Sequence, residues 1–120
     1  MAISQTRAET LIDGLNTAKQ KAMKLELRLV LAGDEAAARR VRTKHRALSR
    51  EIDALLARAM QGWQGRGAAL ERDLRAANRR LQGAVRAVKR RADRAEAVVK
   101  ALGQLDRAIE IATKLLGRAA

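Results

Sequence analysis

Apolar residues recur at alternating spacings of three and four along most of the chain, which indicates amphipathic helices packed along an apolar seam. The first such segment carries its seam at Ala8, Leu11, Leu15, Ala18, Ala22, Leu25, Leu29 and Ala32. Thr6 and Glu9 form a capping-box pattern near its start, a hydroxyl at the N-cap and a carboxylate three residues later. The pattern predicts a first helix over about residues 5–32.

Glycines mark the ends of the first two predicted helices. Gly33 suits the position after a helix end and Asp34 suits the next N-cap, so we expect a tight turn there. One uninterrupted helix through this dipeptide is the alternative. The second helix is predicted over about residues 35–61, with its seam at Ala38, Val41, His45, Leu48, Ile52, Leu55 and Ala59. A Gly-rich turn over residues 62–67 follows, and we expect Trp63 within it to cap the end of the bundle.

The last helical stretch is predicted over about residues 68–118, because no clear stop signal occurs within it. Its seam runs through Leu70, Leu74, Ala77, Leu81, Val85, Val88, Ala92, Ala95, Val99 and Leu102. Gly103 is a candidate kink, and a short fourth helix after Gly103 is the alternative to a continuous one. The pattern therefore predicts an all-α fold, an elongated antiparallel three-helix coiled-coil bundle that forms a single helical domain over residues 1–120.

The predicted helix lengths leave part of the last helix without a neighbour. It would reach about 75 Å, whereas each of the first two would reach about 40 Å. The apolar face of the overhang needs a cover, so either the tail folds back at Gly103 or two chains associate. We expect association with a protein partner, of which a second copy of the chain is the simplest. The predicted partner-helix interface comprises Val99, Leu102, Leu105, Ile109, Ala112 and Leu116.

Composition supports helices and removes several kinds of chemistry. The chain has no Pro, Cys, Phe or Tyr, and Ala and Leu supply most of its 48% hydrophobic content, which favours thin helix packing. Without Cys there is no disulfide, thiolate metal site or thiol nucleophile. His45 has no second His or neighbouring carboxylate in the sequence, so we interpret it as a packed side chain. We therefore expect no enzymatic activity, no cofactor or metal, and no small-molecule substrate.

The net charge of +13 falls mostly beyond residue 33, and residues 74–92 contain no Asp or Glu. On a helix, five arginines would fall within about 40° of one line. They are Arg72, Arg75, Arg79, Arg86 and Arg90. The resulting Arg stripe, about 27 Å long, would suit bidentate phosphate contacts. The candidate anion or nucleic-acid contacts are Arg39, Arg40, Arg42, Lys44, Arg46, Arg72, Arg75, Arg79, Arg86, Lys89 and Arg90.

Two functions follow from these patterns. The leading hypothesis is a non-enzymatic helical interaction protein that associates with itself or a partner through amphipathic helices. The alternative is a nonspecific nucleic-acid-binding or packaging protein whose Arg-rich helix faces contact phosphates. The sequence shows no aromatic platform and no helix-turn-helix or zinc-finger pattern, so such binding would be backbone-driven and strongly salt-dependent. A merely solvated basic face is the plain interpretation of the same residues.

Targeting signals are absent from the sequence as given. No segment approaches about 18 consecutive apolar residues, and the N-terminal residues lack the basic-then-apolar order of a secretory signal. We expect a cytoplasmic protein without a membrane partner; secretion without a cleaved signal remains an alternative.

Trp63-Gln64-Gly65 resembles the WxG turn of the small secreted helical-hairpin proteins of the WXG family. The resemblance covers these three residues and implies a helical hairpin around this turn, but no function.

Overall fold

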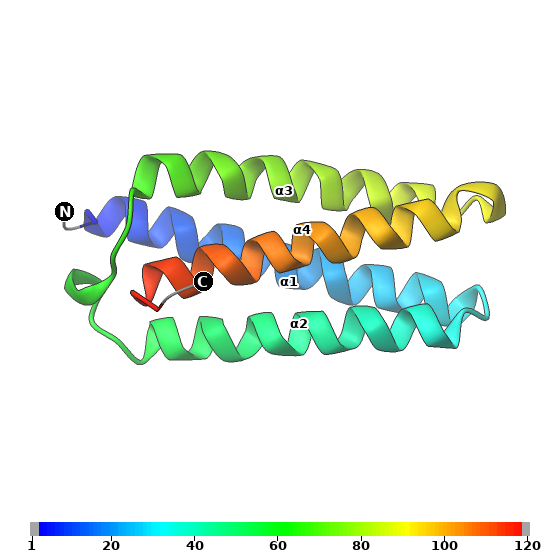
Figure 1. Cartoon of the computed structure of the whole chain (residues 1–120), viewed down its shortest axis with the longest axis horizontal. Helices are drawn as coiled ribbons and strands as arrows, with labels where there is room; N and C mark the ends of the chain where they lie inside the picture. The colour runs from blue at the N-terminus through cyan, green and yellow to red at the C-terminus, as the bar shows by residue number, and fades with distance from the viewer. Residues whose placement is uncertain (1–2, 119–120) are drawn as a thin grey trace.

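The computed structural model describes residues 3–118, and within them the chain forms four α-helices and two short 3-10 helices. The elements are α1 (Gln5–Leu31), α2 (Glu35–Leu56), η1 (Met60–Gly62), α3 (Gly67–Ala87), η2 (Arg91–Asp93) and α4 (Arg94–Leu115). They pack side by side as an elongated bundle of 45 × 22 × 22 Å (Figure 1). The all-α prediction is confirmed for these residues, but the bundle has one more long helix than expected.

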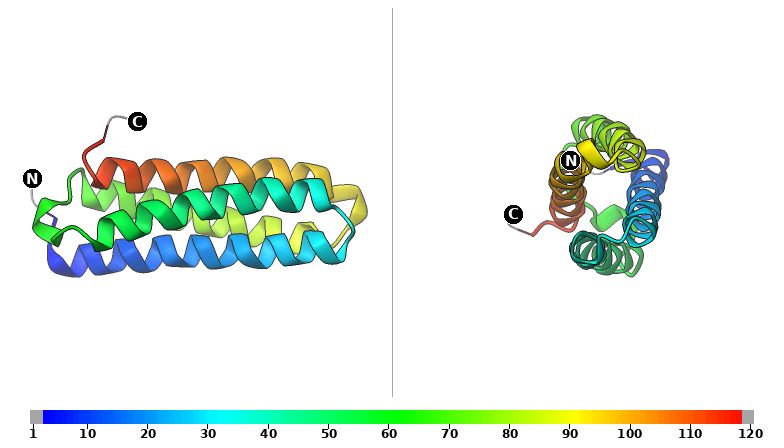
Figure 2. Two further views of the ribbon diagram at one scale, coloured as in Figure 1. Left: turned by 90° about the horizontal axis from the view of Figure 1, so that it is seen from below. Right: turned by 90° about the vertical axis from the view of Figure 1, so that its right-hand side faces the viewer.

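The helices lie at the corners of a square when the bundle is viewed end-on (Figure 2). α1 packs against α2 and α3, and α4 packs against the same two helices. α1 and α4 therefore lie on one diagonal, and α2 and α3 lie on the other. As a result, the outer faces of α2 and α3 point to opposite sides of the molecule.

Both ends of α1 are fixed by side chains and backbone that suit helix termini. The N-cap is Ser4, whose hydroxyl accepts a hydrogen bond from the Arg7 backbone N–H at 3.2 Å. The predicted capping box at Thr6 is wrong, because the extended backbone of Ser4 starts the helix two residues earlier. At the other end Gly33 adopts a positive φ of 82°. The next residue, Asp34, is the N-cap of α2, and its side chain accepts a hydrogen bond from the Ala37 N–H. The predicted turn between the first two helices is confirmed.

The connection from α2 to α3 crosses the end of the bundle along a diagonal (Figure 1). α2 ends at Leu56, five residues earlier than predicted, because η1 and the glycines form this connection. Trp63 is only 2% exposed, and its indole N–H donates to the Leu55 carbonyl at 3.2 Å. The Gln64 N–H donates to the Leu115 carbonyl at 2.8 Å and so ties the connection to α4. The expectation that Trp63 caps the bundle end is confirmed.

The predicted continuous helix over residues 68–118 is wrong, because the chain reverses between Val88 and Asp93. Arg90 has an extended backbone, and the Arg94 side chain donates to the Val88 carbonyl at 3.0 Å across the turn. Like charges four residues apart, such as Arg86 and Arg90, weaken a continuous helix at this point. Reversal also buries the apolar face of α4 against α2 and α3, which stabilises helices more than local propensity does.

Gly103 is not a helix boundary in this structure. It lies inside α4 with an exposed position, and the helix continues past it to Leu115. The proposed short fourth helix after Gly103 is therefore replaced by a full-length fourth helix that begins nine residues earlier, at Arg94.

Candidate functional site

Four arginines lie along one line on the outer side of α3. We define the α3 basic face as Arg72, Arg75, Arg79 and Arg86, all of which are exposed. Leu74 and Leu81, on the other side of the same helix, are buried in the core. The face extends about 21 Å along the axis at about 1.5 Å per residue. It therefore matches the predicted stripe over most of its length.

The arginines of the α3 basic face have no carboxylate partner among residues 3–118. The two acidic residues of α3 are both engaged by neighbouring helices. Glu71 accepts from Arg7 of α1 at 2.7 Å, and Asp73 pairs with Arg107 of α4. Because these carboxylates pair with cations of neighbouring helices, the outward guanidinium groups of the α3 basic face are available to solvent or to an external anion.

Arg90, the last predicted member of the stripe, and the predicted anion contact Lys89 lie in the turn after α3. α3 ends at Ala87, so Lys89 and Arg90 follow the end of the helix and are not held in helical phase with Arg86. Both side chains are exposed, and Arg90 lies 3.4 Å from Asp93 in a weak ion pair. The α3 basic face is thus shorter than the predicted stripe by the residues of the turn.

The basic cluster of α2 divides into paired and unpaired residues. Arg42 contacts Glu26 of α1 at 2.8 Å, and Lys44 contacts Asp106 of α4 at 2.7 Å. These two predicted anion contacts therefore join helices together within the chain. The remaining residues are exposed and have no ion pair within the described part of the chain; Arg39, Arg46 and Arg50 share the outward side of α2, with Arg40 beside them. We define the α2 basic face as Arg39, Arg46 and Arg50.

The residues predicted to form a partner-helix interface lie mostly inside the bundle. Leu105 and Ala112 are fully buried, Leu102 and Leu116 are nearly so, and Ile109 packs against the core. Val99 is the exception, with 63% of its surface exposed. The apolar face thought to overhang is covered by α2 and α3 of the same chain, so the reason for placing a partner there no longer holds.

An exposed apolar strip lies instead on the outer side of α1, near the turn to α2. It consists of Met23, Leu27, Val30 and Leu31, which are 49%, 58%, 36% and 78% exposed. Their spacing places them together on one side of the helix, and the sequence reading overlooked them because it followed only the seam. Residues of this size are normally covered when they cluster.

His45 and Glu26 form a partly buried polar contact between α2 and α1. The His45 Nε2 lies 2.5 Å from one Glu26 oxygen, and Arg42 Nε donates to the other at 2.8 Å. Burial alone would raise the pKa of Glu26, but the hydrogen bonds from His45 and Arg42 hold that pKa below its ordinary value. His45 is packed, as predicted, but its partner comes from another helix and had no local sequence signal.

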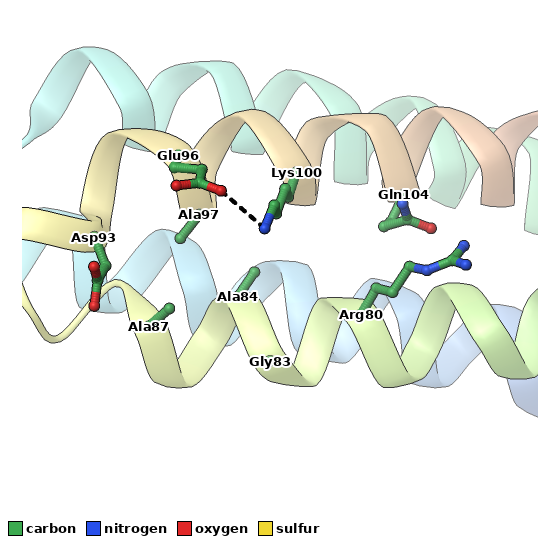
Figure 3. Close-up of a pocket in the computed structure, with 9 residues that line it drawn as sticks. All are labelled: Arg80, Gly83, Ala84, Ala87, Asp93, Glu96, Ala97, Lys100 and Gln104. Atoms are coloured by element: carbon green, nitrogen blue, oxygen red, sulfur yellow. Dashed lines mark ion pairs between the residues drawn. The ribbon is translucent and has the colours of Figure 1, made fainter.

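A groove of about 610 Å³ runs between α3 and α4 near their connecting turn (Figure 3). Small side chains such as Ala84 and Ala97 leave it open, and Arg80 lies at its edge. Glu96 and Lys100 at its rim pair with each other at 2.9 Å. Charges of both signs at its rim give no concentrated site for one ligand. Among residues 3–118, no group of His, Asp and Glu has the arrangement to hold a metal ion.

The comparisons with known proteins add no family. No protein-family model, curated protein or solved structure matches the chain. The WxG resemblance also lacks its structural counterpart, because the helices that flank Trp63 lie on a diagonal of the bundle and do not pair as a hairpin. Within the described residues, no helix is long and apolar enough to cross a membrane.

Proposed function

We propose that the protein is a non-enzymatic helical protein that binds nucleic acid nonspecifically, through arginines that contact backbone phosphates. The observation that carries this proposal is the α3 basic face, four exposed arginines in line without an internal carboxylate. Guanidinium groups bind phosphate oxygens in pairs, and an uncompensated row of them attracts a polyanion over a long range. This is the alternative function raised by the sequence. The leading hypothesis required a free apolar face on the last helix, and that face is covered by α2 and α3 of the same chain.

Salt dependence of binding tests the proposal. We expect the wild-type protein to shift a labelled duplex at low salt, and its affinity to fall steeply as salt rises, because bound phosphates release counterions. The variant Arg72→Gln/Arg79→Gln/Arg86→Gln should lower the slope of log affinity against log salt by about three. Wild-type protein that fails to bind duplex even at low salt contradicts the proposal.

A matched control separates a defined face from overall charge. Lys24→Gln/Lys100→Gln/Lys114→Gln removes the same number of charges from α1 and α4. Lys100 and Lys114 already pair with Glu96 and Glu110, so this variant should keep a salt slope near that of wild type. If both variants lose affinity equally, net charge alone explains the binding and the α3 basic face has no special role.

Self-association is a second candidate, favoured by the exposed apolar strip of α1. A second copy of the chain would cover Leu27 and Leu31, which are the most exposed members of the strip. Sedimentation velocity of the wild type should then show a dimer that Leu27→Glu converts to a monomer. Val99→Glu, at an isolated apolar residue of similar exposure on α4, is the control and should leave the dimer intact. A monomeric wild type at all accessible concentrations would exclude this candidate.

A further inference from the structure

The two basic faces lie on opposite sides of one narrow rod. The α3 basic face and the α2 basic face belong to helices on one diagonal of the bundle, which is 22 Å across (Figure 2). Each face points outward, because the opposite side of each helix, at Leu74 of α3 and Leu48 of α2, is buried in the core. The molecule thus presents two separate basic surfaces that face away from each other.

The two sides of the rod between these faces differ in character. The outer side of α1 carries the apolar strip around Leu27. The acidic residues of α4 are engaged by cations: Glu96 by Lys100, Asp106 by Lys44, and Glu110 by Lys114. Four cations of α1 also have no ion pair in the described chain, but Lys24 is the one exposed member among them; the others are Lys19, Lys21 and Arg28. Among the four long helices, rows of exposed cations without an ion pair are therefore found on α2 and α3.

One duplex does not reach both faces. The rod separates them by its full width of 22 Å, with the apolar core between them. A straight duplex lying along one face leaves the other face directed to solvent. Each face is also long enough to be a binding surface by itself. The α3 basic face extends about 21 Å and the α2 basic face about 16 Å at about 1.5 Å per residue, and duplexes of these lengths carry about twelve and about ten phosphates.

The chemistry of the faces favours a duplex over a single strand. Nonspecific binding of single strands relies on aromatic side chains on which bases stack. Trp63 is the one aromatic residue of the chain, and it is buried in the connection at the end of the bundle. What the faces offer is a straight row of guanidinium groups, which matches the regular phosphates along a rigid double helix.

We propose that a single chain bridges two duplex segments, with one held on the α3 basic face and the other on the α2 basic face. This inference rests on the proposed function, because it assigns the same phosphate-binding chemistry to both faces. It identifies the partner as two stretches of double-stranded nucleic acid and makes the rod a spacer between them.

A two-duplex capture experiment tests the bridge. One duplex, about twice the length of the rod, is fixed to beads, and a fluorescent duplex of the same sequence is added with protein at low salt. The wild type should retain the fluorescent duplex on the beads. Arg72→Gln/Arg79→Gln/Arg86→Gln and Arg39→Gln/Arg46→Gln/Arg50→Gln should each still bind the beads but lower capture at least about tenfold. The Lys24→Gln/Lys100→Gln/Lys114→Gln control should capture as the wild type does.

Mixing the two face variants distinguishes one chain from two. If a single chain bridges, the mixture stays as weak in capture as either variant alone, because each molecule has one functional face. Capture restored by mixing would show bridging through associated chains and would overturn the proposal. Wild-type protein that binds the beads without capturing the second duplex would overturn the bridge alone, whereas absence of bead binding would overturn the proposed function as well.

Discussion

Trp63 shows how one residue secures the irregular end of the bundle. Its ring is buried, and its N–H bonds to Leu55 at the end of α2, while the next residue bonds to Leu115 at the end of α4. Trp63→Ala should lower the free energy of unfolding by about 3–5 kcal/mol, since it leaves a large cavity. Trp63→Phe retains most of the apolar volume and should cost less. Urea unfolding followed by circular dichroism measures both, and equal losses would contradict the role given to ring volume.

Glu26 links stability to acid. Its pKa in the folded chain lies below the ordinary value of 4.5, so the stability it contributes is present above that value. This stability is lost as the pH falls through the lower, folded-state pKa. Glu26→Gln should therefore lower the free energy of unfolding by about 1–3 kcal/mol at neutral pH. In acid, the difference in this free energy between the variant and the wild type should become smaller. Urea midpoints over a pH series provide the measurement.

The control for Glu26 is Asp53→Asn, which changes an exposed carboxylate without an ion pair in the described chain. It should leave stability near that of wild type at every pH. A Glu26→Gln variant that keeps its full deficit well below pH 4.5 would show that packing, and not the charge of Glu26, accounts for the loss.

The sequence identified residues that need only a periodic pattern. Most apolar positions of the seam, such as Leu11, Leu48 and Leu81, are buried as expected. The exceptions are exposed and lie near helix ends or on the outer side of α4: Ala32, Ala59, Ala92, Ala95 and Val99. Residues whose role depends on another helix had no such signal. Arg42 and Lys44 belonged to a basic run in the sequence, yet carboxylates far along the chain turn them into internal ion pairs. Which charges remain free is decided by tertiary structure.

Among the elements, the helix boundary at residues 88–93 was the main failure of sequence reasoning. Gly33 and the glycines around Trp63 mark real turns, whereas no Gly or Pro marks the turn after α3. The seam also continues in phase closely enough to suggest one helix. The turn depends on packing: α4 gains two neighbouring helices by folding back, and this gain outweighs the local preference for a continuous helix.

Substitution by alanine should affect stability in opposite ways at Gly103 and at Gly14. A methyl group at Gly103 meets no atom, so Gly103→Ala should stabilise α4 by about 1 kcal/mol through helix propensity. At Gly14 the added carbon would lie 2.6 Å from a methyl carbon of the buried Leu74. Overpacking there costs about 1–3 kcal/mol, so Gly14→Ala should be less stable than Gly103→Ala by a similar amount.

Thermal or urea unfolding of these two variants also tests the helix boundaries. A bend at Gly103 would require the conformational freedom of glycine, and Gly103→Ala would then destabilise the protein. Gly83→Ala, at another helical glycine with open space around it, should gain stability as Gly103→Ala does. If Gly14→Ala matched these two gains, α1 and α3 would not approach each other as closely as described.

At the scale of the whole molecule, the unpaired arginines place function and stability in opposition. A net charge of +13 repels itself, and arginines three or four residues apart, such as Arg72, Arg75 and Arg79, disfavour the helix that carries them. Gln has nearly the helix propensity of Arg. Arg72→Gln/Arg79→Gln/Arg86→Gln should therefore raise stability by about 0.5–1 kcal/mol at low salt while it weakens binding of duplex.

The melting temperature, measured over a series of salt concentrations, tests whether the unpaired arginines destabilise the fold. Screening relieves repulsion, so the melting temperature of the wild type should rise with added sodium chloride and approach that of the variant. The control Lys24→Gln/Lys100→Gln/Lys114→Gln removes two paired lysines and should show no such gain at low salt. A face variant less stable than wild type at every salt concentration would mean that the arginine stems pack on the bundle and serve the fold. A gain in stability joined to a loss of binding would mean that the chain retains these charges for an external anion.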